Sequence, residues 1–448
     1  MQPRVVRLAV PGADPGSAYV AADGRLPRLT FDVADDETTV GTLQRTVLPG
    51  VGVSGPVLDC FLAVPDDWTP ASVVPGFVEA EPQRAGWSPP SGWRDAPVDE
   101  VRFDGPEALR ARFDQWRAER AGAAADPLAP PWSRSGWHAR VTDWVDAALA
   151  DAGRTRVDDV EQVRAWGISA VLRTSGDDGR PYWFKAVCEH FRTEVPITTA
   201  LHVSAPGLVP PVLAADDANG WLLLGDVTGD QAGPAVTGEA ASHPSAFAAL
   251  RELQRAAADR RGELLESGVV SRPLATLADQ LADALGDADL RHWHGASPER
   301  AGTLVGWVVE QVDRLAALGL PDVLVHGDFH PGNVAELADG RRVVFDWSDA
   351  AIAPPFIDVV TWLSWLDDAD EPAHEQVWRS FADQWTDVLG VDEWLALRPV
   401  LDGVAGAYHT VSYVGIVRNL DVLRRPEHGD GVRHFFTLLD RAVPSTTA

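Results

Sequence analysis

Three polar side chains in the second half of the sequence have the types and spacing to bind a metal ion and activate a hydroxyl group. The apolar start of "VLVHGDFHPGN" leads to Asp328, and Asn333 follows five residues later. A second apolar run, "VVF", leads to Asp346. Asn333 and Asp346 offer the oxygen ligands that Mg²⁺ prefers, while Asp328 can accept a proton from a hydroxyl. Phosphoryl transfer requires this division of roles.

The only lysine of the chain is a second candidate for chemistry. Lys185 lies in "PYWFKAV", and all the other basic side chains among the 38 are arginines. The alternation of a strand places Lys185 on one face with Trp183 and Val187. A lysine is a compact charge on a flexible stem, whereas an arginine is a rigid fork, so a phosphate site could require the lysine. The alternative is one chance survivor of a bias towards arginine.

These motifs resemble those of the aminoglycoside phosphotransferase and choline kinase-like family of small-molecule kinases. The family pattern combines His-Gly-Asp, an Asn five residues later, an Asp-Trp pair and a final Asp in a Gly-x-Pro-x-x-Asp segment. The corresponding residues here are Asp328, Asn333, Asp346 and Asp358. Ala353 replaces the glycine of the last segment, and we expect it to alter only a loop. The resemblance covers roughly residues 135–448.

The resemblance implies a protein-kinase-like fold with ATP and Mg²⁺ as cofactors, and it suggests a role for each motif. Asp328 would be the catalytic base, and His326 and Asp358 would hold the loop around it. Asn333 and Asp346 would bind Mg²⁺. The residues implied at the nucleotide are Lys185 on the phosphates, Glu194 as the partner of Lys185, Ser169 in the turn "RAWGISAV", and Gly225, Asp226 and Val227 at the adenine.

The acceptor is expected to be a small molecule with a hydroxyl group, such as an amine-bearing sugar or an aminoglycoside. In related kinases the helical part supplies the substrate contacts. The candidates in this chain are Trp362, Trp365, Asp367, Asp368, Tyr408 and His409, with Tyr413 and Arg418 in the same stretch as the last two. Tryptophans at helical spacing are more often core residues, so packing is the competing interpretation for Trp362 and Trp365.

The order of elements predicts an α+β chain with a sheet-rich part followed by a helical part. Short alternating runs interrupted by two helices predict an N-terminal α+β accessory domain at residues 1–125. The stretch "AGAAADPLAPPWSRSG" then resembles a linker. Three strand-like runs and a hairpin predict a kinase-like sheet lobe at 135–228. Periodic helices predict a helical lobe with the catalytic loop at 229–448.

Composition narrows the partners and the compartment. The net charge of −28 argues against nucleic acid and anionic membranes as partners. It favours a cationic small molecule, with an acidic and arginine-biased proteome as the alternative explanation of the charge. The two cysteines are too few for a disulfide framework, so we expect a reducing, cytoplasmic environment. We expect no signal peptide and no membrane span, because the first residues contain no long apolar core and no uncharged run is long enough to cross a bilayer.

Two other functions stay open from the sequence. A nucleotide-binding regulator without catalysis would resemble a pseudokinase, although such proteins usually lack part of the Lys-Asp-Asn-Asp set. A metal-dependent hydrolase could use His326, Asp328 and His330, whose spacing is typical of ligands. The remaining histidines lie in no matching motif, which weakens the hydrolase interpretation.

Overall fold

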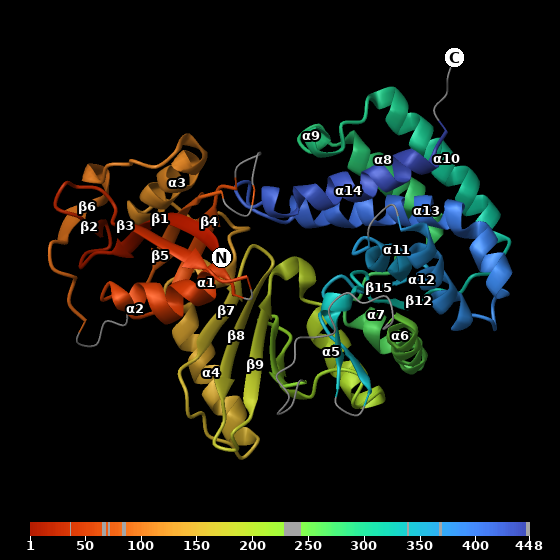
Figure 1. Ribbon diagram of the computed structural model, residues 1–448, viewed down its shortest axis with the longest axis horizontal. Helices are drawn as coiled ribbons and strands as arrows, with labels where there is room; N and C mark the ends of the chain where they lie inside the picture. Colours follow the sequence, from red (N-terminus) through yellow and green to blue (C-terminus); the bar gives the residue numbers. More distant parts are fainter. Residues whose placement is uncertain are drawn as a thin grey trace. The chain divides into compact units, whose positions relative to one another are not determined.

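The computed structural model describes residues 1–35, 37–64, 69, 72–82, 87–227, 243–337, 340–366 and 370–444 (Figure 1). The chain divides into two compact units. The first comprises Met1–Cys188 with Leu420–Leu423, and the second comprises Glu189–Asn419 with Arg424–Ala448. Within the described residues, no helix is both long enough and apolar enough to cross a membrane.

The first unit begins with a six-stranded sheet in the order β4-β5-β1-β2-β6, with β3 also paired to β1. The central strands β1 and β5 are parallel, and the other pairs are antiparallel. The strands are β1 (Gln2–Pro11), β2 (Ser17–Val20), β3 (Arg28–Val33), β4 (Val57–Leu62), β5 (Val74–Ala80) and β6 (Arg94–Pro97). This sheet confirms the strands that the alternating runs predict for the N-terminal part of the chain.

Both faces of this sheet are covered. Successive residues of β1 point to opposite faces, and they are buried in two different hydrophobic clusters. On one face Val6 and Leu8 pack with the helical segment α1 (Thr39–Thr42), η1 (Leu43–Val47) and α2 (Leu48–Gly50). On the other face Ala9 packs with Trp116 of α3 (Arg110–Arg120). The 3-10 turns η2 (Val98–Glu100) and η3 (Glu107–Leu109) precede α3.

The first unit continues with α4 (Trp137–Asp151) and an antiparallel meander of β7 (Glu161–Ala165), β8 (Ser169–Ser175) and β9 (Pro181–Val187). The apolar face of α4 is buried at Val141, Val145 and Leu149. The predicted hairpin joins β8 to β9, with Ser175 opposite Pro181. The three strand-like runs are thus confirmed as strands.

The second unit is mainly helical, as the periodic pattern predicts. It also holds the hairpin of β10 (Val212–Asp216) and β11 (Trp221–Gly225). Its helices are α5 (Glu194–Ser204), α6 (His243–Ala258), α7 (Arg261–Glu266), α8 (Leu277–Gly286), α9 (Arg291–His294), α10 (Pro298–Ala316), α11 (Ile357–Leu363), α12 (Glu371–Asp383), α13 (Val391–Arg418) and α14 (Pro426–Ala442), with the 3-10 turns η5 (Glu189–Phe191) and η7 (Leu274–Thr276).

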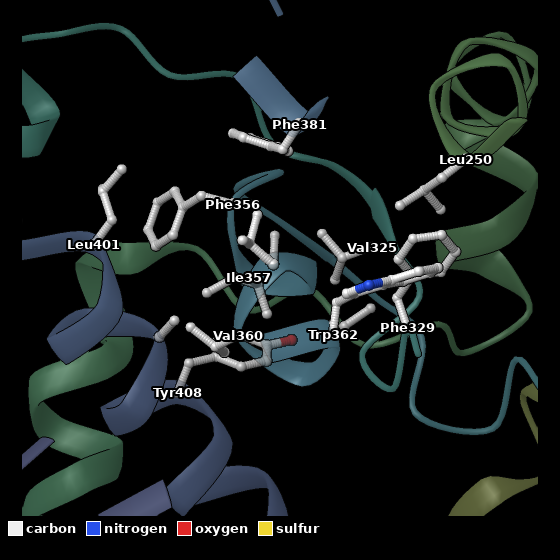
Figure 2. Packing of buried hydrophobic residues seen from close by; sticks show 14 of the residues in the cluster. Leu250, Val325, Phe329, Phe356, Ile357, Val360, Trp362, Phe381, Leu401 and Tyr408 are labelled. Atoms are coloured by element: carbon white, nitrogen blue, oxygen red, sulfur yellow. The ribbon is translucent and has the colours of Figure 1, made fainter. Parts of the chain in front are cut away.

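The core of the second unit lies under the loop that carries Asp328. Phe329 points into it and packs against Trp362 of α11, with ring centroids 5.1 Å apart (Figure 2). Phe247 of α6 contacts both rings. A rigid aromatic layer therefore supports the backbone next to Asp328.

Two short antiparallel pairs bring the candidate residues to one place. β12 (Val323–Val325) pairs with β15 (Ala351–Ala353), and β13 (Val334–Glu336) pairs with β14 (Arg342–Val344). Asp328 follows β12, Asn333 ends the 3-10 turn η8 (Pro331–Asn333) before β13, and Asp346 follows β14. The two apolar runs that lead to Asp328 and Asp346 in the sequence are thus confirmed as strands.

Candidate active site

The loop after β12 is held by a buried carboxylate. Asp358, in the first turn of α11, accepts hydrogen bonds from the backbone N–H groups of His326 (3.0 Å) and Gly327 (2.8 Å). Its side chain is fully buried, and burial raises the pKa of Asp358 to about 7 against the opposing effect of these two bonds. Both donors lie immediately before Asp328, so the bonds fix the direction in which the chain reaches that residue.

His326 holds the same loop from the other side. Its Nε2 lies 3.0 Å from the Phe345 carbonyl, to which it donates, and its Nδ1 accepts from the Asp328 N–H at 3.3 Å. Burial lowers the pKa of His326 to about 4, which keeps the ring neutral and preserves these two roles. Because both ring nitrogens bond to backbone, the geometry gives no support to His326 as a ligand in the hydrolase alternative.

Asn333 and Asp328 are in direct contact. The Asn333 Nδ2 donates to the Asp328 carbonyl at 2.9 Å and lies 3.4 Å from Asp328 Oδ2. A bond to a carbonyl requires the amide nitrogen, so the Asn333 Oδ1 is the atom left to act as a ligand. The Asp328 side chain remains 38% exposed, which is compatible with contact to a substrate.

Asp346 adopts a strained backbone conformation. Its φ is 67°, and no other described residue except glycine has a positive φ. Residues held in this way are frequent at functional sites. Ser348 donates to Asp346 Oδ1. The Phe345 N–H donates to the Asn333 carbonyl at 3.0 Å, which ties the residue before Asp346 to Asn333. The backbone next to Asp346 is thus hydrogen-bonded to Asn333. The amide and carboxylate oxygens of these two side chains are ligands that suit Mg²⁺.

His330 is a partner of Asp328 that sequence reasoning missed in this role. Its Nε2 lies 3.5 Å from Asp328 Oδ2, and its Nδ1 accepts from the Gly332 N–H at 3.0 Å. Its ring stacks on Trp365, with centroids 4.5 Å apart and planes 16° apart. Its position two residues after Asp328 was the available signal, and the sequence interpretation used it only for the hydrolase.

The predicted acceptor residues are placed in different environments. Trp365 is 56% exposed, whereas Trp362 is 2% exposed and lies in the core. Tyr408 and His409 are also buried, and His409 Nε2 lies 3.1 Å from the Ile357 carbonyl. Packing is therefore the favoured interpretation for Trp362, Tyr408 and His409. Asp367 and Asp368 lie outside the described residues.

Two further residues from that stretch of α13 differ in their surroundings. Tyr413 packs on Phe435, and burial raises its pKa, with the charge of Asp328 as a smaller cause. Arg418 forms ion pairs with Asp283 (2.6 Å) and Asp287 (2.9 Å). Arg418 is thus engaged by α8 and its C-terminal end, which indicates a structural contact.

The predicted nucleotide residues of the first unit lie on the meander. Lys185 is 8% exposed on β9 and pairs with Val171 of β8. Ser169 begins β8, and its Oγ accepts from the indole N–H of Trp166 at 2.7 Å. The turn 166–168 is therefore ordered by a tryptophan and contains a single glycine.

The second unit contains two of the predicted nucleotide contacts, the carboxylate of Glu194 and the segment Gly225–Val227. Glu194 is the first residue of α5 and is 2% exposed. Gly225 ends β11, and its N–H donates to the Pro211 carbonyl at 2.8 Å. Asp226 and Val227 follow it and are half-buried.

The helical unit contains a hollow of about 580 Å³ between α11, α12, α13 and α14. Ser364, the neighbour of Trp365, lines it. Asp402 and Arg398 lie on its α13 side, 3.4 Å apart, and burial raises the pKa of Asp402 to about 6. Acidic and arginine side chains both line this hollow, so its charge does not select for a polycation. Within the described part of the chain, no group of three metal-ligating side chains is found.

Comparison with known proteins identifies the family. Residues 111–399 match the model of the phosphotransferase enzyme family, APH. No curated protein sequence matches the chain. Similar solved structures include the GDP and kanamycin complex of APH(2")-IIIa, with 16% identity over 68% of this chain and 98% of that chain, and a TM-score of 0.46. Choline kinase LicA from Streptococcus pneumoniae has 13% identity over 68% and 99%, with a TM-score of 0.48.

The family match covers more than half of the chain and confirms the predicted protein-kinase-like fold, with a sheet lobe and a helical lobe after an N-terminal α+β domain. The division at residues 125, 135 and 228 stays a prediction. The chain belongs to the phosphotransferase enzyme family.

Proposed function

We propose that the protein transfers the γ-phosphoryl group of ATP to a hydroxyl group of a small molecule. The observation that supports this most is the contact of Asn333 with Asp328, together with the bond that joins Asn333 to the segment of Asp346. In the step, the acceptor oxygen forms a bond to the γ-phosphorus, and the bond from that phosphorus to the bridging oxygen breaks. ADP leaves, and the hydroxyl proton passes to Asp328.

Each remaining residue has a role in positioning and charge. Asn333 and Asp346 would hold Mg²⁺, which when bound neutralises charge on the phosphates. Lys185 would contact the α- and β-phosphates, with Glu194 as its partner. The turn at Ser169 would cover the phosphates, and the segment Gly225–Val227 would meet the base. His330, held against Trp365, would orient Asp328 through its Oδ2.

The acceptor proposed from the sequence is an amine-bearing sugar or an aminoglycoside. Trp365 supports an acceptor site beside Asp328, because an exposed tryptophan offers a face for a sugar ring or a cation. Ser364, the residue before Trp365 in the sequence, lines the hollow between α11, α12, α13 and α14. Its mixed charges suit a neutral or singly charged sugar at least as well as an aminoglycoside.

ADP release with Mg-ATP tests the proposal across aminoglycosides, amino sugars, neutral sugars and choline. Asp328→Asn is the control, since asparagine keeps the size and the backbone contact to Asn333. We expect an acceptor-dependent rate that falls at least about a hundredfold in the variant. A rate that persists in the variant would reject Asp328 as the base. Nucleotide binding with no turnover of any acceptor would favour the pseudokinase alternative.

A further inference from the structure

The turn between β7 and β8 has no glycine-rich sequence, and it is ordered by side chains instead. Trp166 donates its indole N–H to Ser169 Oγ at 2.7 Å and its backbone N–H to the Ser169 carbonyl at 3.1 Å. The Arg164 guanidinium lies over the Trp166 ring, 3.6 Å from its centroid. The Cys188 N–H donates to the Ile168 carbonyl at 2.9 Å. The turn is thus fixed at both ends.

The predicted linker contributes a further contact to this turn. Trp132 lies in the 3-10 turn η4 (Pro131–Ser133), is 2% exposed, and donates its indole N–H to the Trp166 carbonyl at 2.9 Å. Its ring also contacts Trp137 of α4 edge-on, with centroids 6.1 Å apart. A buried tryptophan with a satisfied donor is a fixed point of the fold. The segment therefore braces the turn, which a flexible linker could not do.

The N-terminal domain also holds the strand that enters the turn. Gln162 of β7 is 1% exposed, and its carboxamide donates to the Val57 carbonyl (2.9 Å) and accepts from the Val57 N–H (2.7 Å). One residue further along β7, Thr38 donates to the Val163 carbonyl. Arg45 forms an ion pair with Glu161 at 2.8 Å. Three consecutive residues of β7 are thus bound by the N-terminal domain.

We propose that Trp132 is a positioning residue for the phosphates of the nucleotide, and that the N-terminal domain fixes the phosphate turn through β7. The inference rests on the proposed function, because it requires that the turn 166–168 meets phosphates. Backbone N–H groups bind phosphate well when they are held in place beforehand, since no ordering cost falls on the binding step. In this chain Trp132 holds the turn in place. The turn lacks the glycines that would let its backbone approach the nucleotide closely.

Trp132→Phe tests the inference, because phenylalanine keeps an aromatic ring and removes the indole donor. Trp87→Phe is the matched control, since Trp87 also donates its indole N–H to a backbone carbonyl, Gly52, at 2.8 Å in the same unit. Binding of Mg-ADP and of adenosine is measured by calorimetric titration, with the guanine compounds used instead if the wild type prefers them. Loss of one neutral hydrogen bond corresponds to about five- to tenfold in an equilibrium constant.

The expected result is Mg-ADP binding about five- to tenfold weaker in Trp132→Phe, adenosine binding unchanged within about twofold, and no change in Trp87→Phe. A purely structural role would weaken both ligands alike or neither, and either outcome overturns the inference. If Trp132→Phe lowers the melting temperature strongly, Arg164→Gln is used in its place. Arg164 is exposed, and its substitution removes the contact of the guanidinium with the Trp166 ring and so loosens the same turn. Wild-type protein that binds no nucleotide refutes the proposed function itself, whereas normal binding by the variants refutes only the role of the turn.

Discussion

The carboxylate of Asp358 bonds to the N–H of Gly327 at 2.8 Å, and Gly327 has a φ of 80° that brings its Cα against the Asp349 carbonyl. A Cβ atom added at Gly327 would lie 2.2 Å from the Asp349 oxygen. The same peptide therefore needs both a left-handed conformation and the absence of a side chain. This geometry sets the direction of the following residue, Asp328.

Gly327→Ala is expected to lower the free energy of unfolding by about 3 kcal/mol or more, since it combines a left-handed alanine with a backbone clash. Turnover should fall at least about a hundredfold, because a shift of about 1 Å at Asp328 has effects of that size. Gly179→Ala is the control: Gly179 also has a positive φ, of 76°, but open space around its Cα. It should cost only about 1 kcal/mol. Equal costs in denaturant unfolding would show that the contact with Asp349 is unimportant.

Lys185→Arg is expected to reduce turnover more than tenfold although the charge is kept, because Lys185 is 8% exposed and a guanidinium is larger and more rigid. Lys185→Met should reduce it further. Steady-state rates at saturating Mg-ATP measure both. A fully active arginine variant would mean that the lone lysine is a chance survivor of the arginine bias.

Asp346→Asn is expected to weaken binding of Mg-ATP at least about tenfold while leaving metal-free ATP binding unchanged. Asparagine tolerates a positive φ, so the backbone at 67° should persist and the melting temperature should change little. Calorimetric titration with ATP, with Mg²⁺ or with a chelator, separates the two cases. Equal loss with and without Mg²⁺ would contradict a metal-binding role.

Protonation of the buried His409 is expected to destabilise the protein in acid. Burial lowers the pKa of His409 to about 4 from its ordinary value of 6.5, so the unfolded chain binds a proton more readily than the folded chain. The stabilisation is complete above pH 6.5 and is lost as the pH falls towards 4. Between pH 7 and pH 5 this histidine alone accounts for roughly 2 kcal/mol. In His409→Gln, urea unfolding should show a pH dependence that is smaller by about that amount, and an unchanged slope would contradict the assignment.

Asp328 and Asp346 could be located from the sequence because each follows a short apolar strand, and strand ends are readable from local pattern. Asn333 was located by its spacing of five residues after Asp328. The strained φ of Asp346 and the stacking of His330 on Trp365 were not readable. The first is a property of a local backbone turn, and the second depends on packing between segments more than thirty residues apart.

The segment 121–136 shows a second limit of sequence reasoning. Alanine and proline made it resemble a linker, yet Trp132 within it is buried and bonded to Trp166. Composition describes local flexibility, whereas the burial of one tryptophan depends on what the fold places next to it. The same limit applies to Trp362 and Trp365, because helical spacing alone does not say which ring faces the core. The structure shows that Trp362 is buried and Trp365 is exposed.

Phosphorus NMR of Mg-ATP, followed with each acceptor for wild type and Asp328→Asn, tests the central claim most directly. The account predicts that the wild type converts the γ-phosphate signal into a phosphomonoester signal with at least one acceptor, and that the variant does so at least about a hundredfold more slowly. Release of inorganic phosphate without a phosphomonoester, at equal rates in both proteins, would contradict phosphoryl transfer to a hydroxyl through Asp328.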